Sequence, residues 1–350
     1  MRKNSWHFLG LIALAAAALQ GQTTPVYWST TIPDCSSLSN PVVEITNSSG
    51  TVIGYSCSVS GTFVWLATGG GWTSKIRVGA PATAAIGVDY TFYDPNGNNL
   101  SLDSTFGGGA ITSSNEVSFA LSANQPSEVD LLGATSNAPA YGPTTTGTAY
   151  AVFYCPDAVT CTNVLPQLIY LQQPTHPWLA TVPIAWDDAT WTQWSAEGVD
   201  DGTSNNVVSF VVYNQGTTAT SFNVDVFDGT GTLVASGTTP LIPPLPLLSG
   251  GFYGEGGTYG ADLRTPGLIT SGTVPTGVIK ILIDGGTVDS SVQMFQITGP
   301  SLASMQVAND AAPGSTGIIA SAVRRAHAKS VRGVPAQKRV FGALPHSNAP

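Results

Sequence analysis

Histidine, a frequent residue in catalytic and metal sites, is almost absent from the part of the chain that could surround an active site. The chain has 350 residues and 4 histidines, of which His7 stands near the start and His327 and His346 near the end. Only His176 remains, within the segment PTHPW. A Ser-His-Asp triad or a histidine-rich metal site therefore has little material. We predict a protein without catalytic residues and without a cofactor.

Carboxylates stand beside tryptophans in one segment, residues 185–202, which reads AWDDATWTQWSAEGVDDG. Acids next to aromatic rings suit sugar binding, or glycosidic cleavage where two carboxylates face each other across a cleft. The carbohydrate-binding candidates are Trp178, Trp186, Trp191 and Trp194. The calcium-binding candidates are Asp187, Asp188, Asp200 and Asp201. We favour simple packing of the tryptophans, followed by a carbohydrate surface, a calcium site and hydrolysis, in that order.

The four cysteines are Cys35, Cys57, Cys155 and Cys161. An even number suggests two disulfides in an oxidising compartment, and four cysteines allow three pairings. Cys155 and Cys161 flank a short segment between two strand-like runs, so this local pair could staple a hairpin. A Cys35–Cys57 pair would close a loop worth about 3 kcal/mol. We favour disulfides over free or metal-bound thiols.

Charge is scarce and unevenly distributed. The chain has 12 Lys+Arg and 21 Asp+Glu, for a net charge of −9. All acids fall between Asp34 and Asp310, where only four cations stand, so this body carries 4 − 21 = −17. Six cations follow, at Arg324, Arg325, Lys329, Arg332, Lys338 and Arg339. An acidic body repels phosphates, so we expect no nucleic-acid partner. The basic segment 310–350 is expected to be a flexible tail.

The first residues have the pattern of a secretory signal. Arg2 and Lys3 precede the apolar run FLGLIALAAAAL, residues 8–19, and small residues follow it. This run is shorter than the roughly 20 residues that a transmembrane helix needs. We therefore expect a signal peptide over 1–22, no transmembrane segment, and a bacterial protein secreted to the periplasm or the extracellular space.

The body shows the two-residue period of β-strands. In residues 86–92 and 222–226 every second side chain is apolar, and turn sequences such as Asp94-Pro-Asn-Gly97 separate the runs. Asp94, Asn96 and Asn98 resemble the start of a calcium loop, but the distal Glu of such a loop is missing, so a hairpin turn is the better prediction. The sequence predicts an all-β protein.

An internal match indicates that one unit occurs twice. Residues 74–97 align with 208–231 at an offset of 134, and 147–154 align with 277–284 at an offset of 130. Two matches in the same order, with nearly equal offsets, favour duplication over chance similarity of Thr/Val-rich strands. We predict an N-terminal strand module over 23–63, containing the first cysteine pair, and two tandem immunoglobulin-like β-sandwiches over 64–177 and 178–309.

The same segments carry a resemblance. The strings GGGWTS (69–74), YDPNG (93–97), TGTAYAVF (146–153) and VVSFVVYNQGTTATSFNVDVFDGTGTLVAS (207–236) resemble secreted tandem β-sandwich proteins of unknown function from soil bacteria, especially acidobacteria. The likeness covers about residues 65–300. It implies the tandem fold and no particular activity, because its motifs are structural turns.

These observations together predict a secreted, non-catalytic structural or interaction protein at or outside the cell envelope. Its expected partners are envelope polysaccharide or another surface protein. The alternatives are a carbohydrate-binding module that uses the tryptophans of residues 178–194, and an envelope-associated hydrolase that uses the neighbouring carboxylates.

Overall fold

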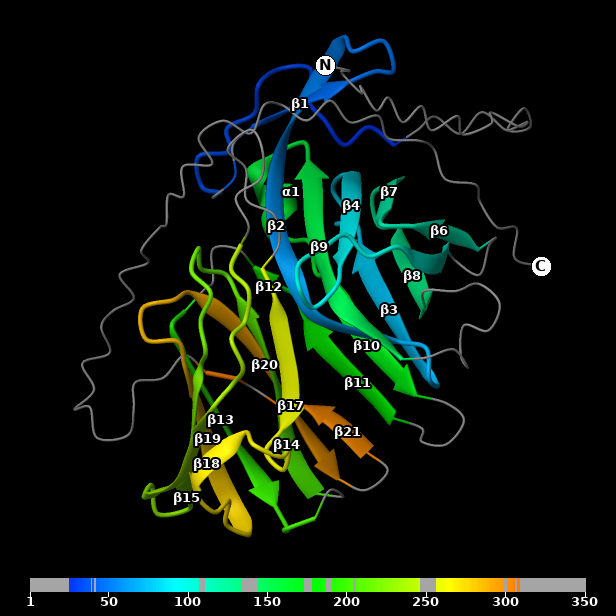
Figure 1. The fold of residues 1–350 in the computed structure, drawn as a ribbon. Helices are drawn as coiled ribbons and strands as arrows, with labels where there is room; N and C mark the ends of the chain where they lie inside the picture. The colour runs from blue at the N-terminus through cyan, green and yellow to red at the C-terminus, as the bar shows by residue number, and fades with distance from the viewer. Residues whose placement is uncertain are drawn as a thin grey trace, which may run out of the picture.

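The protein is all-β, with antiparallel sheets, one short helix and two disulfides. The structure is a computed structural model and describes residues 25–38, 40, 42–106, 111–133, 144–172, 178–186, 191–203, 206–245, 256–298, 301–305 and 307–308. The expected signal peptide over 1–22, the basic tail and His176 lie outside the described residues. Figure 1 shows two groups of strands, which we call body one (upper) and body two (lower).

Body one consists of two sheets with a core between them. The first has the order β1 (Val43–Thr46), β2 (Val52–Thr68), β9 (Thr145–Cys155), β4 (Ile86–Tyr93) and β7 (Glu116–Leu121), and β12 (Ala185–Trp186) also pairs with β2. The second has the order β11 (Trp178–Pro183), β10 (Gln167–Gln172), β3 (Trp72–Gly79), β8 (Pro126–Gly133), β5 (Leu102–Phe106) and β6 (Thr112–Ser114). The helix α1 (Ala158–Thr162) follows β9.

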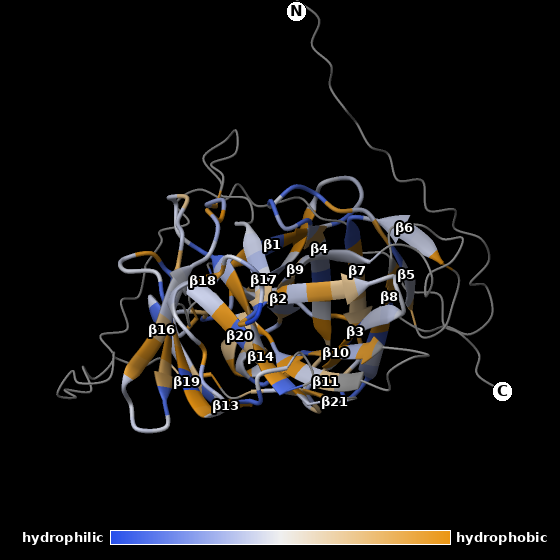
Figure 2. Cartoon of the chain, turned by 60° about the horizontal axis from the view of Figure 1, so that its bottom comes forward, coloured by the Kyte–Doolittle hydropathy of each residue, from blue (hydrophilic) through white to orange (hydrophobic). Residues whose placement is uncertain are grey.

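Body two also has two sheets and a core of its own. The order of the first is β13 (Gln193–Asp200), β19 (Gly277–Asp284), β15 (Asn223–Asp228), β16 (Leu233–Thr238) and β18 (Ile269–Gly272). The order of the second is β17 (Thr258–Asp262), β14 (Asn206–Asn214), β20 (Ser290–Thr298) and β21 (Ser301–Ser304). Hydrophobic and hydrophilic residues alternate along strands of both bodies in Figure 2, as sheets with one buried face require.

The pairing of strands recurs from one body to the other. In body one, β2 pairs with β9, β9 with β4 and β4 with β7, while β3 lies between β10 and β8. In body two, β13 pairs with β19, β19 with β15 and β15 with β16, while β14 lies between β20 and β17. The aligned segments occupy equivalent places: β3 and β4 correspond to β14 and β15, and β9 corresponds to β19.

The aligned residues also share their burial and their turns. Val88 and Phe222, which the alignment equates, are both fully buried. Asp94 Oδ1 accepts hydrogen bonds from the backbone N–H groups of Asn96 and Asn98, at 2.8 and 2.9 Å. The turn after Asp228 repeats this pattern two and four residues later, at 2.8 and 3.0 Å. The carboxylate of Asp94 thus organises a hairpin turn.

Strand pairing differs from the expected domain boundaries at two places. β2 runs without a break through residues 63 and 64, so the expected N-terminal module shares a strand with the first sandwich. β11 and β12 pair with β10 and β2 of body one, although residues 178–186 were expected to begin the second sandwich. By pairing, body one continues to Trp186, because an edge strand joins whichever sheet offers it hydrogen bonds.

The two disulfides link Cys35 to Cys57 and Cys155 to Cys161. Cys57 and Cys155 stand opposite each other on β2 and β9, so the two bonds are adjacent, and all four cysteines belong to the core of body one. The sequence left three pairings open. In the structure the neighbours Cys57 and Cys155 each bond to a cysteine outside the β2–β9 pair, and the Cys155–Cys161 bond spans the start of α1.

The bodies pack directly on each other. The indole of Trp65 on β2 lies against Gly260 on β17, and the rings of Tyr170 and Phe295 meet edge to face with centroids 5.7 Å apart. The N–H of Thr258 donates to the carbonyl oxygen of Pro95, at 2.9 Å, and so links β17 to the Asp94 turn of body one. Ring packing and a main-chain hydrogen bond together restrict motion between the bodies.

Candidate functional site

The tryptophans of the carbohydrate hypothesis belong to different elements and make different contacts. Trp186 on β12 packs edge to face on Phe153 in the core of body one, with ring centroids 5.9 Å apart. Trp194 on β13 packs against the core of body two. Its Nε1 donates to the carbonyl oxygen of Trp191 at 3.3 Å and to Ser290 Oγ at 3.2 Å. These contacts hold the rings in place, and all three keep part of their surface exposed.

For Trp178 the structure describes the backbone, which pairs with Gln172 on the edge strand β11 of a body-one sheet. Of the calcium candidates, Asp187 and Asp188 lie outside the described residues, while Asp200 and Asp201 follow one another where β13 ends. The sugar-binding and calcium-binding hypotheses therefore remain predictions.

Asp200 belongs to a polar cluster at the end of β13 in body two. Its side chain is fully buried, and its Oδ1 accepts hydrogen bonds from Arg264 Nη2 and, at 2.8 Å, from the N–H of Gly202. Arg264 follows β17, and its own N–H donates to Asp262 Oδ1 at 2.7 Å. The ion pair therefore fastens the end of β13 to the end of β17, from opposite sheets of the body.

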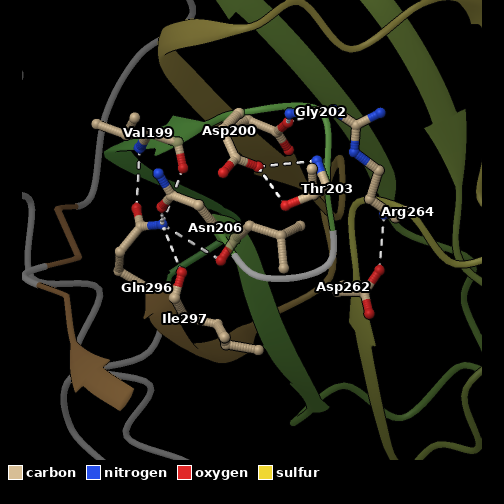
Figure 3. Close-up of polar contacts among 11 residues, drawn as sticks. Val199, Asp200, Gly202, Thr203, Asn206, Asp262, Arg264, Gln296 and Ile297 are labelled. Atoms are coloured by element: carbon tan, nitrogen blue, oxygen red, sulfur yellow. Dashed lines mark hydrogen bonds and ion pairs between the residues drawn. The ribbon is translucent and has the colours of Figure 1, made fainter. Parts of the chain in front are cut away.

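Gln296 on β20 forms the second half of this cluster (Figure 3). Its Oε1 accepts the N–H of Val199 at 2.8 Å, and its Nε2 donates to the carbonyl oxygen of Val199 at 2.8 Å and to Asn206 Oδ1 at 2.9 Å. The side-chain amide of Gln296 thus forms hydrogen bonds with both the N–H and the carbonyl oxygen of Val199 on the edge strand β13. The cluster closes one end of body two as a set of structural cross-links.

Asp201 points into a separate, exposed turn. Its Oδ1 accepts the hydroxyl of Thr203 at 2.6 Å and the N–H of Thr203 at 2.8 Å. Hydrogen bonding by Thr203, with a smaller contribution from Arg264, lowers the pKa of Asp201. Its bonded oxygen therefore organises the turn, whereas the bonded oxygen of Asp200 accepts from Arg264 and Gly202. Among the residues that the structure describes, no group of three or more His, Cys, Asp and Glu side chains could hold a metal ion.

Body one has a charged ladder on the outer face of its second sheet. Lys75 Nζ lies 2.8 Å from Glu128 Oε1 and 2.9 Å from Asp130 Oδ1, and Arg77 Nη2 lies 2.7 Å from Glu128 Oε2. Hydrogen bonds from Lys75 and then Arg77 lower the pKa of Glu128. The only two cations of body one are therefore used in cross-strand pairs between β3 and β8.

Sequence reasoning missed the role of Arg264. A usable signal was present, because Arg264 is the only arginine between Arg77 and Arg324. Arg264 and Lys280 are the two cations that body two offers to its many acids, and a buried charged side chain needs a partner of opposite charge. Which of the acids Arg264 would choose depends on the sheet-to-sheet packing, and sequence spacing does not encode that choice.

No family model matches the chain, and neither a curated protein nor a solved structure matches it. Within the described ranges, no helix combines the length and the hydropathy that crossing a membrane requires.

Proposed function

We propose that the protein is a secreted, non-catalytic structural or interaction protein at or outside the cell envelope, built from two duplicated immunoglobulin-like sandwiches. The observation that carries the proposal is the direct packing of body one on body two through Trp65, Tyr170 and Phe295. Such packing makes a rigid two-body unit, which suits a spacer or a scaffold that presents surfaces at a fixed separation. Both disulfides fit an oxidising compartment.

The strand order supports an immunoglobulin-like relationship with one change. In an immunoglobulin constant domain the first strand joins the second and fifth, and the last strand joins the third and sixth. Here the strands β3, β4, β8 and β9 take the places of B, C, E and F, but the first strand β2 pairs with β9 and the last strand β10 pairs with β3. In body two the first strand β13 likewise pairs with β19, and the last strand β20 pairs with β14. The shared departure from the immunoglobulin order favours duplication of one ancestral unit.

Expression of the full chain in a bacterial host tests this proposal. We expect the protein outside the cytoplasm, with its N-terminus shortened to near residues 18–22 and all four cysteines oxidised, as shown by fractionation and intact-mass measurement. A cytoplasmic protein with free thiols would contradict export. Turnover of polysaccharide or peptide substrates by the purified protein would contradict the non-catalytic role.

Carbohydrate binding is the second candidate, favoured by the partial exposure of Trp186, Trp191 and Trp194. Aromatic rings stack on sugars, so each Trp→Ala variant should migrate faster in affinity electrophoresis through envelope polysaccharide if its ring binds. Thermal melting of the same variants distinguishes the hypotheses. A variant that melts at a lower temperature but migrates like the unchanged protein would support a packing role alone.

A further inference from the structure

One outer sheet face of body two combines apolar and acidic side chains. Val224, Val226 and Ile281 point into the core between the sheets. Because side chains alternate along a strand, their neighbours Asp225 and Leu282 point to the opposite, outer face of β15 and β19. We call this outer surface of β13, β19, β15 and β16 the acidic face.

The apolar part of the acidic face is unusual for an outer surface. Leu282 is 2% exposed and Phe227 8% exposed, although both point away from the core. Beside them, Val278 on β19 is 57% exposed and Leu233 on β16 is 52% exposed. Val199 on β13 stands opposite Val278 and is 41% exposed. Val199 and Val278 thus form an exposed aliphatic pair on adjacent strands. Leu233 is separated from this pair by β15, where it stands opposite Phe227.

The acidic part comes from Glu197, Asp225 and Asp284. Glu197 stands opposite Lys280. Lys280 and Asp284 both lie diagonal to Asp225, one on each side of Leu282. Asp284 Oδ1 accepts the N–H of Gly286 at 2.7 Å. Burial, and then the charge of Asp284, raise the pKa of Asp225. Neither Asp225 nor Asp284 takes part in a salt bridge among the described residues. A cation bound beside these two carboxylates would offset the repulsion between their charges.

The described chain ends at the edge of this face. Ser195 donates its N–H to the carbonyl oxygen of Ala308 at 2.7 Å, and Ala308 donates its N–H to the carbonyl oxygen of Ser195 at 2.8 Å. Ser195 belongs to β13, the edge strand of the sheet. Residues 309–350 follow from this point and contain six cations and a single acid, Asp310.

We propose that the basic C-terminal segment, residues 311–340, docks on the acidic face of its own chain. Its cations would meet Asp225 and Asp284. Its apolar residues, in the sequence GIIASAVRRAHAKSVRGV, would cover the exposed pair of Val199 and Val278 and the separate side chain of Leu233. The docked segment is an intramolecular competitor: while it is bound, its cations are withheld from any external anionic partner. This inference stands independently of the proposed function.

The chain is long enough for this contact. Arg324 follows Ala308 by 324 − 308 = 16 residues, and an extended chain covers at most about 3.5 Å per residue, or roughly 55 Å. Four strands at a spacing of about 4.8 Å place β13 and β16 only roughly 15 Å apart. Exposed charge pairs are individually weak and are screened by salt, so docking should be reversible and strongest at low ionic strength.

Carbodiimide cross-linking of the full chain, analysed by mass spectrometry, tests the contact directly. We expect amide links from Lys329 or Lys338 to Asp225, Asp284 or Glu197 at low salt and their loss at high salt. Cross-linking an equal mixture of isotope-labelled and unlabelled protein separates links within one chain from links between chains. Links to body-one acids at equal frequency would overturn the proposal, and so would links that form only between chains.

Tryptic cleavage within residues 324–339 provides a second measurement. In the double variant Asp225→Asn with Asp284→Asn, cleavage at low salt should be about three- to tenfold faster, because two charge contacts are lost. The matched control, Glu44→Gln with Glu116→Gln, removes two exposed acids from body one and should leave the rate unchanged. Equal rates in both double variants would show that the tail does not use the acidic face.

Discussion

Individual charged residues in this protein act mainly as cross-links. Arg264 pairs with Asp200 and Arg77 pairs with Glu128, and the two pairs differ in how deeply the carboxylate is buried. Asp200 has no exposed side-chain surface, whereas the side chain of Glu128 is 30% exposed. A carboxylate that loses its cation while buried keeps the cost of desolvation, whereas an exposed one is solvated by water.

Replacing Arg264 by Met should therefore destabilise the protein. We expect a loss of about 2–3 kcal/mol in the free energy of unfolding, below the 3–5 kcal/mol of fully buried pairs because Arg264 is partly exposed. Urea denaturation measures this change. Arg77→Met is the control and should cost under about 1 kcal/mol. Equal effects of the two substitutions would refute the structural role assigned to Asp200.

Glu128 gives a pH dependence of defined sign. Its folded-state pKa lies below the ordinary value of 4.5, so its contribution to stability is complete above 4.5 and disappears as the pH falls through the lowered pKa. Glu128→Gln should lower stability at neutral pH and reduce the loss of stability between about pH 5 and pH 3. Urea denaturation at both pH values checks this, and an unchanged pH slope would be the contrary result.

At the scale of elements, turns with one left-handed glycine reverse the direction of the chain after a strand. Gly97 and Gly231 have φ values of 82° and 84°, and Gly50 in the β1–β2 turn has 78°. At each place the residue three positions earlier accepts a hydrogen bond from the glycine N–H at 2.9 Å. A type I turn followed by a left-handed residue matches the twist of paired strands, as between β15 and β16 and between β1 and β2. After Gly97 the chain returns to β4 through the single bridge of Tyr93 and Asn99, and β5 then joins the other sheet.

Gly231→Ala tests the turn without any steric conflict. A Cβ at Gly231 would meet nothing within 4 Å, so the whole cost comes from the left-handed backbone, about 1–2 kcal/mol. Gly229→Ala in the same turn is the matched control, because its Cβ would make only one ordinary contact, 3.7 Å from the carbonyl oxygen of Val278. Urea denaturation should show the larger loss for Gly231, and the reverse order would contradict the conformational argument.

At the scale of the whole molecule, the two bodies share apolar packing but differ in covalent reinforcement. All four cysteines lie in body one, and the core of body one also includes Val211, Tyr213 and Phe295 from body two. Stability of the two bodies is therefore coupled through packing, while disulfide constraints act on body one alone.

Reduction should loosen body one first. Without the two disulfides, we expect faster amide exchange at β1, at α1 and at the start of β2, with retained protection at β14 and β19, because only body one loses its covalent constraints. Hydrogen-exchange mass spectrometry with and without reductant measures this. Uniform protection under both conditions, or preferential loss in body two, would be inconsistent with the expectation.

Trp65→Ala should uncouple the bodies. Removing the indole that lies against Gly260 leaves a gap in the interface, with a cost of about 2–3 kcal/mol for a partly buried ring. We expect one calorimetric transition in the native protein and two in the variant. Trp28→Ala, whose ring packs near Gly54 at the other end of body one, should keep a single transition. A single transition for Trp65→Ala would show that the interface contributes little to cooperativity.

The amino-acid sequence by itself determined the features that depend on local patterns. Alternation along residues such as Val88 and Phe222 predicted the all-β class, and Asp94 and Asp228 predicted turns, because one sheet face and one turn type constrain residues only a few positions apart. The even cysteine number predicted two disulfides. The self-match also identified segments that occupy equivalent places in the two bodies.

Tertiary structure decided the features that depend on distant segments. β11 and β12 joined body one rather than the second unit, Trp186 packed on Phe153, and Arg264 selected Asp200 among the acids of body two. Each choice depends on which sheet edge or which buried group is nearest in space. Local periodicity specifies the face that a side chain takes on its strand, but it carries no information on the partner that approaches that face from elsewhere in the chain.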